Sequence, residues 1–97
     1  MNVIFLPAAQ EELAAAVAYL EIRAPGLGAE LLDDVERISA LASTLPSIGR
    51  TLDDIHRRVT LQRFAYHLVY RIRDDATLVV VAVAHKKRRP GYWRTER

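Results

Sequence analysis

TLVVVAVAH, residues Thr77–His85, is the stretch that decides the fold of this 97-residue chain. From Leu78 to Ala84 it contains seven apolar residues in a row. Successive side chains of a β-strand point to opposite faces of the sheet, so both faces of this segment are apolar. We therefore predict a strand covered on both faces, by helices on one side and by the C-terminal segment or a partner chain on the other.

The residues before this strand have the two-residue period of a half-buried sheet. In RVTLQ, residues 58–62, apolar and polar side chains alternate. Tyr66–Arg73 predicts a further strand, and RDDA, residues 73–76, a turn into Thr77–His85. The preceding SIGRTLDDI, residues 47–55, has no regular period, so we expect a loop or an irregular connector there.

Two helices are predicted between a short strand at Val3–Leu6 and this connector. Pro7 suits the first position of a helix, and Glu11 and Glu12 follow in its first turns, where carboxylates complement the helix dipole. The apolar face of the first helix consists of Leu13, Val17, Leu20 and Ala24, and that of the second of Leu31, Val35, Ile38, Ala42 and Leu45. PGLG, residues 25–28, separates the helices and Pro46 ends the second, which predicts an antiparallel helical hairpin.

The predicted order of elements is therefore β-α-α-β-β-β. This order indicates an α+β fold, in which the helical hairpin packs on a small, mainly antiparallel sheet. A chain of 97 residues with 51% apolar and 27% charged residues has the composition of an ordinary globular protein with one core. We expect a single domain over residues 1–97.

Several classes of protein and of site are excluded by composition and spacing. The chain has no cysteine, hence no disulfide and no thiolate metal site. Its longest apolar run is seven residues, whereas a membrane span needs roughly 20, and no secretory signal is apparent, so we expect a cytoplasmic protein without a membrane partner. We find no Gly-rich phosphate loop, no HExxH and no Ser-His-Asp order. His56, His67 and His85 lie on separate segments, and neither a metal nor a cofactor is predicted.

The net charge of +2 conceals two halves of opposite sign. Residues 1–54 contain three cations and nine acids, whereas residues 55–97 contain eleven cations and three acids. Such asymmetry indicates a surface that faces a polyanion or an acidic partner. The alternative is that the two halves attract each other within the fold.

The basic residues are the main candidates for a binding surface. Arg58 has the opposite parity to Val59 and Leu61, so it should point away from the helices. If His67, Arg71 and Arg73 point the same way, the open face of the sheet is cationic. Any single strand arginine can instead be solvated, with its stem along apolar surface. The candidate target- or nucleic-acid-binding residues are Arg58, Arg63, Arg71, Arg73, Lys86, Lys87, Arg88 and Arg89.

Three residues near the C-terminus have both a structural and a chemical interpretation. A histidine that closes an apolar strand, as His85 does, is usually hydrogen-bonded to hold the strand end, although its pKa of about 6.5 also permits proton transfer. Tyr92 and Trp93 are expected to pack the tail back over the sheet rather than to stack on a substrate.

Over almost its whole length the chain resembles the RelE/ParE superfamily of bacterial toxins from type II toxin–antitoxin systems. The stretches that carry the resemblance are LPAAQEEL (6–13), APGLGAELLDDV (24–35), LPSIGR (45–50), RRVTLQRFAYHLVYRI (57–72) and VVVAVAHKKRRPGYW (79–93). The last is similar to the family ending H-x-x-R-x-P-x-Y-W, which places its histidine on His85 and its arginine on Arg88. The resemblance implies a toxin neutralised by a cognate antitoxin, with which it forms a hetero-oligomer.

The superfamily divides by mechanism, and the resemblance leaves both branches open. ParE-type members bind DNA gyrase and have no known catalytic set, whereas RelE-type members cut mRNA in the ribosome without a metal. Of the nuclease positions this chain retains Arg58, but Thr60 occupies another and His67 stands where an arginine is expected. We therefore expect a ParE-like gyrase inhibitor, with a RelE-like mRNA endonuclease as the alternative. The candidate catalytic residues for that alternative are Arg58, His67, His85, Arg88 and Tyr92.

Overall fold

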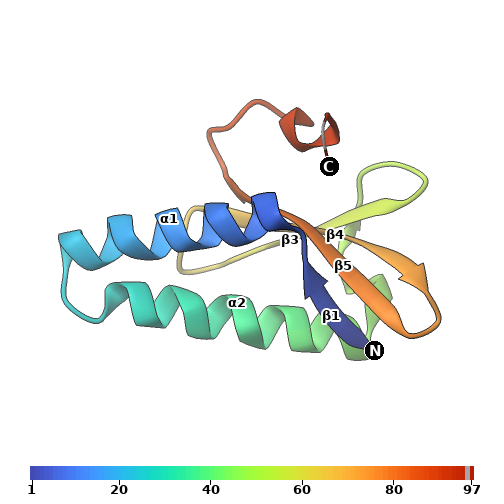
Figure 1. Cartoon of the computed structure of the whole chain (residues 1–97), viewed down its shortest axis with the longest axis horizontal. Coiled ribbons are helices and arrows are strands. Elements are labelled where there is room, and N and C mark those ends of the chain that lie inside the picture. Colours follow the sequence, from blue (N-terminus) through green and yellow to red (C-terminus); the bar gives the residue numbers. More distant parts are fainter. Residues whose placement is uncertain (96) are drawn as a thin grey trace.

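The computed structural model describes residues 1–95 and residue 97 (Figure 1). Its helices and strands are β1 (Asn2–Phe5), α1 (Pro7–Arg23), α2 (Leu27–Thr44), β2 (Arg50–Thr51), β3 (His56–Thr60), β4 (Tyr66–Asp74) and β5 (Thr77–His85). Short 3-10 turns lie at Pro46–Ile48 and Tyr92–Arg94. The strand predicted from TLVVVAVAH is thus confirmed with its bounds.

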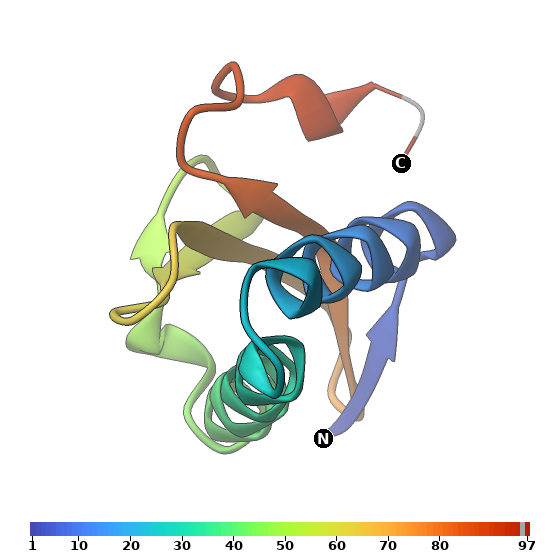
Figure 2. The same cartoon turned by 90° about the vertical axis from the view of Figure 1, so that its left-hand side faces the viewer.

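The strands form one mixed sheet in the order β1-β5-β4-β3-β2. β1 pairs with β5 in parallel, and the three remaining pairs are antiparallel. α1 and α2 pack on one face of this sheet, and the chain that follows β5 crosses the other face (Figure 2). The expected α+β architecture of a helical hairpin on a mainly antiparallel sheet is confirmed.

The connector before β3 is more regular than its sequence indicates. Arg50–Thr51 forms β2 and pairs with Arg57 and Arg58 of β3, so the prediction of a loop is wrong at these two residues. The Tyr70 side chain fixes this segment, because its hydroxyl donates to the carbonyl oxygen of Pro46 at 2.5 Å and accepts from the N–H of Gly49 at 3.0 Å. Hydrogen bonds to a distant side chain leave no local sequence pattern.

The helical hairpin closes tightly at PGLG. Gly26 adopts a left-handed conformation with φ of 88°, which favours glycine. The Glu21 carboxylate accepts hydrogen bonds from the N–H groups of Gly26 and Gly28, at 2.8 and 3.1 Å, and so caps the first turn of α2. A Cβ atom at Gly28 would lie 2.5 Å from the carbonyl oxygen of Val17, so only glycine fits where the two helices meet.

The larger core lies between the helices and the sheet. Leu31, Val35, Ile38 and Ala42 of α2 are buried there with Ala9 and Ala16 of α1 and with Leu68, Tyr70, Leu78, Val80 and Val83 of the sheet. Two residues of the expected helical faces are not part of it. Ala24 is exposed and follows the end of α1, and Leu45 follows the end of α2 and is 47% exposed.

A smaller core on the opposite face of the sheet is closed by the C-terminal tail, residues 86–95 and 97. We call this face the tail face. A β-bulge at Val81, which lies between the paired residues Val80 and Ala82, turns both Val81 and Ala82 toward it. Trp93 from the tail packs on them and is 4% exposed. The tail therefore covers the second apolar face of β5, which is one of the two arrangements expected from the sequence.

Glu12 fastens the tail to the sheet. β1 runs beside only the first half of β5, which leaves the backbone of Val83 without a strand partner on that side. One carboxylate oxygen of Glu12 accepts the Val83 N–H at 3.0 Å, and the other accepts the Tyr92 hydroxyl at 2.5 Å. Arg97 forms a two-pronged ion pair with the same carboxylate, both distances being 3.0 Å. No acid lies in the first turn of α1, so the predicted dipole role of Glu11 and Glu12 is wrong.

Replacement of Trp93 by alanine is expected to lower the free energy of unfolding by about 3–5 kcal/mol, because the change leaves a large cavity over β5. Urea unfolding followed by circular dichroism measures the loss. Arg89→Ala, an exposed change in the same tail, is the control and should cost no more than about 0.5 kcal/mol. Equal stabilities of the two variants would contradict a structural role for the tail.

Replacement of Glu12 by glutamine is expected to cost about 1–3 kcal/mol, because one amide cannot satisfy the Val83 N–H, the Tyr92 hydroxyl and the Arg97 guanidinium together. Glu11→Gln is a matched control, since Glu11 is the exposed neighbour on the same helix. The same unfolding measurement applies. A loss no greater than that of Glu11→Gln would show that the carboxylate does not fasten the tail.

Candidate functional site

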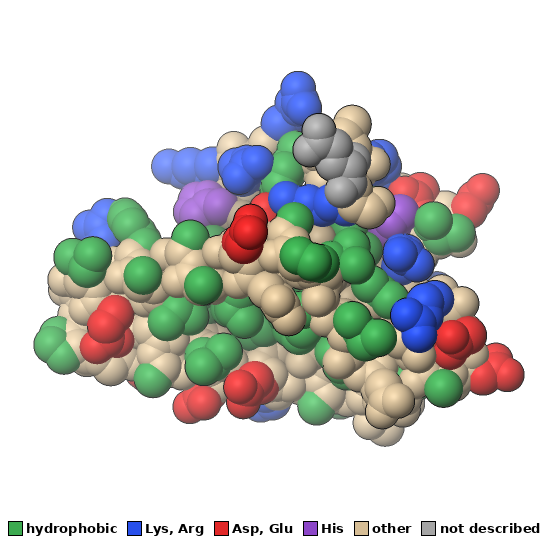
Figure 3. Space-filling model, in the orientation of Figure 1, with side chains coloured by type: hydrophobic (Ala, Val, Ile, Leu, Met, Phe, Trp, Pro, Cys, Tyr) green, Lys and Arg blue, Asp and Glu red, His purple; other side chains and the backbone are tan. Residues whose placement is uncertain are grey.

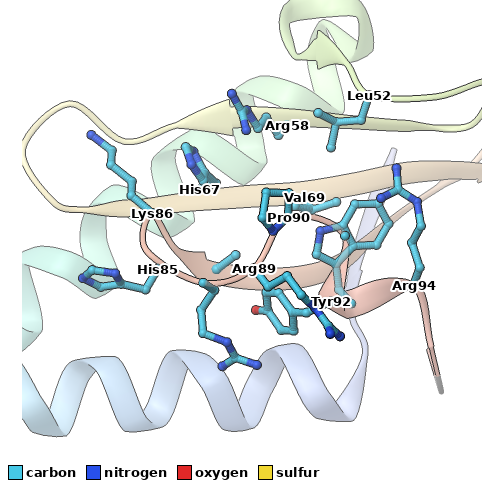
Figure 4. Close-up of a pocket in the computed structure, with 14 residues that line it drawn as sticks. Leu52, Arg58, His67, Val69, His85, Lys86, Arg89, Pro90, Tyr92 and Arg94 are labelled. Carbon is cyan, nitrogen blue, oxygen red and sulfur yellow. The ribbon is translucent and has the colours of Figure 1, made fainter.

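A pocket of about 220 Å³ lies between the tail face and the tail (Figure 4). β3 contributes Arg58, β4 contributes His67 and Val69, and the end of β5 contributes His85. The tail closes the other side. The tail residues that line the pocket are Lys86, Arg88, Arg89, Pro90, Gly91, Tyr92, Trp93 and Arg94. We call this the basic pocket, and all five candidate catalytic residues line it.

The Tyr92 hydroxyl is occupied by its bond to Glu12. Burial, together with the hydrogen bond to the Glu12 carboxylate, raises the pKa of Tyr92 to about 12. The hydroxyl therefore stays protonated near neutral pH and donates to Glu12. The Arg88 guanidinium lies over the Tyr92 ring at 3.8 Å from its centroid, where the ring face attracts a cation.

His85 holds the end of β5, as its structural interpretation predicts. Its Nδ1 accepts the backbone N–H of Lys87 at 3.0 Å, and its carbonyl oxygen accepts the N–H of Arg88 at 2.9 Å. The His85 and Tyr66 rings also form a T-shaped pair, with centroids 5.2 Å apart. These contacts start the turn that carries the tail back over the sheet.

The surroundings of His67 disfavour its protonated form. Its Nδ1 lies 2.8 Å from the hydroxyl oxygen of Thr60, its cross-strand neighbour. Burial is the main cause that lowers the pKa of His67 below its usual 6.5, and the positive charges of Arg58 and Lys86 lower it further. The two nearby cations therefore add to the effect of burial and disfavour a further positive charge in the basic pocket.

The two oppositely charged halves of the sequence do attract each other in part. Arg63 pairs with Glu30 at 2.8 Å, Arg94 with Asp53 at 3.0 Å, and Arg97 with Glu12. The other cations of the tail and its pocket have no acidic partner within residues 1–95 and 97; these are Arg58, Lys86, Lys87, Arg88 and Arg89. Lys and Arg side chains gather over the tail, whereas acidic side chains lie along the helices and at the right-hand end of the view (Figure 3).

Comparison with known proteins gives the same fold and adds the family. A family model described as "ParE toxin of type II toxin-antitoxin system, parDE" matches residues 3–90. The chain belongs to the ParE toxin family. It is thus a ParE-like toxin of the type II class, whose partner is a cognate antitoxin, and the RelE-like alternative is not favoured.

A solved structure shares the architecture of this ParE family member. It is described as the chromosomal ParDE TA system from P. aeruginosa, and it aligns with a TM-score of 0.63 and 16% identity over 88% of this chain and 95% of the other. A search of curated proteins found no match. Within the described residues, no helix is long and apolar enough to cross a membrane.

The remaining sequence candidates do not line the basic pocket. Arg63 is held by Glu30 of α2. Arg73 lies by Asp74 and Thr77, where β4 turns into β5. Arg71 is paired with His56 and Val79 and so belongs to the tail face, but it lies outside the pocket, as does Lys87. Among the residues that the structure places, no group of three or more His, Asp or Glu side chains could hold a metal ion.

Asp53 supports the pocket but was not among the candidates from the sequence. Its carboxylate accepts the backbone N–H groups of Ile55 and His56, at 2.9 and 2.7 Å, and pairs with Arg94 of the tail. The bond to Ile55 is the largest of the interactions that lower the pKa of Asp53. When an aspartate carboxylate accepts a hydrogen bond from the backbone N–H two residues later, the segment forms an Asx-turn. A run such as LDDI can indicate this turn in a sequence.

Substitution of Arg58 by glutamine is expected to raise the pKa of His67, because one of the two repelling cations disappears, but to leave it below about 6.5, because burial remains. An NMR pH titration of the His67 ring protons measures the change. Arg71→Gln removes an equal charge from the same face and should leave the pKa unchanged.

The lowered pKa of His67 also determines how the stability of the protein depends on pH. Unfolded His67 binds a proton more readily than folded His67, so protonation costs stability as the pH falls below about 6.5. A His67 pKa at or above 6.5 in the unmodified protein would contradict the excess of positive charge in the basic pocket.

Proposed function

We propose that this protein stops bacterial growth by binding DNA gyrase in the cytoplasm, and that its cognate antitoxin neutralises it as a hetero-oligomer. The observation that carries the proposal is the match to the ParE toxin family over residues 3–90. ParE-type members act by binding a protein target, so their function depends on a binding surface rather than on a catalytic group. The proposed domain is the whole chain, residues 1–97.

The basic pocket contains His67 as a possible base but no good acid, which supports binding over cleavage. Metal-independent cleavage of RNA needs a base for the 2′-hydroxyl, an acid for the leaving oxygen and cations for the phosphate. The cations are present, but the Tyr92 hydroxyl is bonded to Glu12 and its pKa of about 12 makes it a weak acid. His85 uses Nδ1 to hold the strand end. Within the described residues, no carboxylate lines the pocket.

The proposed target is tested with purified gyrase and relaxed plasmid DNA. The protein is expected to block supercoiling or to leave cleaved DNA complexes, and the same doses should leave translated mRNA intact in primer extension. Induced expression in a bacterium should stop growth, and the amount of protein present at that point gives the dose to use with purified gyrase. Normal supercoiling at toxic doses would remove gyrase as the target.

The alternative has its own signature in the same experiment. Cuts at fixed codon positions in translated mRNA would show a RelE-like nuclease, and their loss in Arg58→Ala, His67→Ala and Arg88→Ala would assign the pocket residues to catalysis. Cuts that persist in all three variants would place the nuclease site elsewhere. The gyrase proposal expects no such cuts at all.

A further inference from the structure

The basic pocket contains more cations than acidic partners among the residues that the structure describes. Arg94 is paired with Asp53, but Arg58, Lys86 and Arg89 have no acidic partner among the residues that the structure describes. Arg58 and Lys86 line the same pocket as His67, and the positive charges of both lower the pKa of that histidine. Figure 4 shows Arg58 and His67 side by side on neighbouring strands, with Lys86 on the same side of the pocket. An anion bound here would relieve this repulsion.

The positive charge continues along the sheet beyond the pocket. Arg50 of β2 is the direct cross-strand partner of Arg58 of β3, so both side chains lie on the same face. Like charges directly opposite each other destabilise a strand pair, and no carboxylate in the described part of the chain compensates them. Arg50, Arg58 and Lys86 thus form a row of cations from the sheet edge to the tail.

The size of the basic pocket limits its ligand. Pockets for drug-sized molecules and cofactors measure about 300–1,000 Å³, whereas this pocket measures about 220 Å³. A single phosphate group suits this volume, and an arginine fork binds phosphate through two parallel hydrogen bonds. A row of cations leading out of the pocket suits a polymer with regularly spaced negative charges rather than one isolated anion.

We propose that the basic pocket binds a backbone phosphate of a nucleic acid strand, with Arg58 and Lys86 as its main charged groups and Arg50 on the next phosphate. The proposal goes beyond gyrase binding, because contact with a phosphate backbone needs no gyrase. Combined with the proposed function, it lets the toxin contact the DNA that gyrase holds.

The test is the affinity of the full chain for a short fluorescent DNA duplex, measured by anisotropy without gyrase between about 50 and 200 mM salt. The variant carries Arg58→Gln and Lys86→Gln. Its control carries Arg23→Gln and Arg37→Gln, which remove the same charge from the helices. Loss of two phosphate contacts is expected to weaken binding roughly 10–100-fold and to reduce the slope of log affinity against log salt by about 1.8. The control should bind within about twofold of the unmodified protein.

A second readout separates a bound phosphate from general attraction. A phosphate in the pocket brings negative charge to His67, so addition of the duplex should raise the His67 pKa in an NMR titration. Equal losses in the two double variants, or an unmoved His67 pKa, would overturn the proposal. Equal competition by a polyglutamate peptide would assign the pocket to an acidic protein segment instead. If the unmodified protein inhibits gyrase but does not bind the duplex, the phosphate proposal is overturned and the proposed function stands.

Discussion

The structure depends on the burial of both faces of β5. A strand with seven consecutive apolar side chains is buried best inside a sheet and between two layers. β1 and β4 occupy its two edges, the helical hairpin covers one face, and the tail covers the other. The bulge at Val81 adjusts the strand to this arrangement, because it turns two consecutive side chains toward the tail.

The same tail that completes the core also builds the basic pocket. Trp93 is its apolar anchor, Glu12 of α1 fastens it through Tyr92, and Asp53 fastens it through Arg94. These contacts hold Lys86, Arg88 and Arg89 over the sheet, opposite Arg58 and His67. The stability of the tail and the geometry of the candidate site are therefore coupled, and a change that loosens Trp93 should also disperse the cations.

Much of the fold could be predicted, because the decisive patterns are local. Each of these patterns predicts the backbone conformation of its own segment. They are the two-residue period before β4, the unbroken apolar run of β5 and the PGLG break between the helices. β2 and the role of Glu12 could not be predicted, because they depend on partners distant in sequence. The segment around Gly49 is held by Tyr70, and Glu12 accepts the N–H of Val83.

The sequence by itself determined the elements, the doubly apolar strand and the division of charge between the halves. Residue identity and periodicity suffice for these, since they require no knowledge of which segments meet. Only the tertiary structure decided which cations remain unpaired. It paired Arg63, Arg94 and Arg97 with acids of the first half, and it gathered Arg58, His67 and Lys86 in one pocket. Electrostatic interactions depend on distance in space, and the folding of the tail over β5 sets those distances.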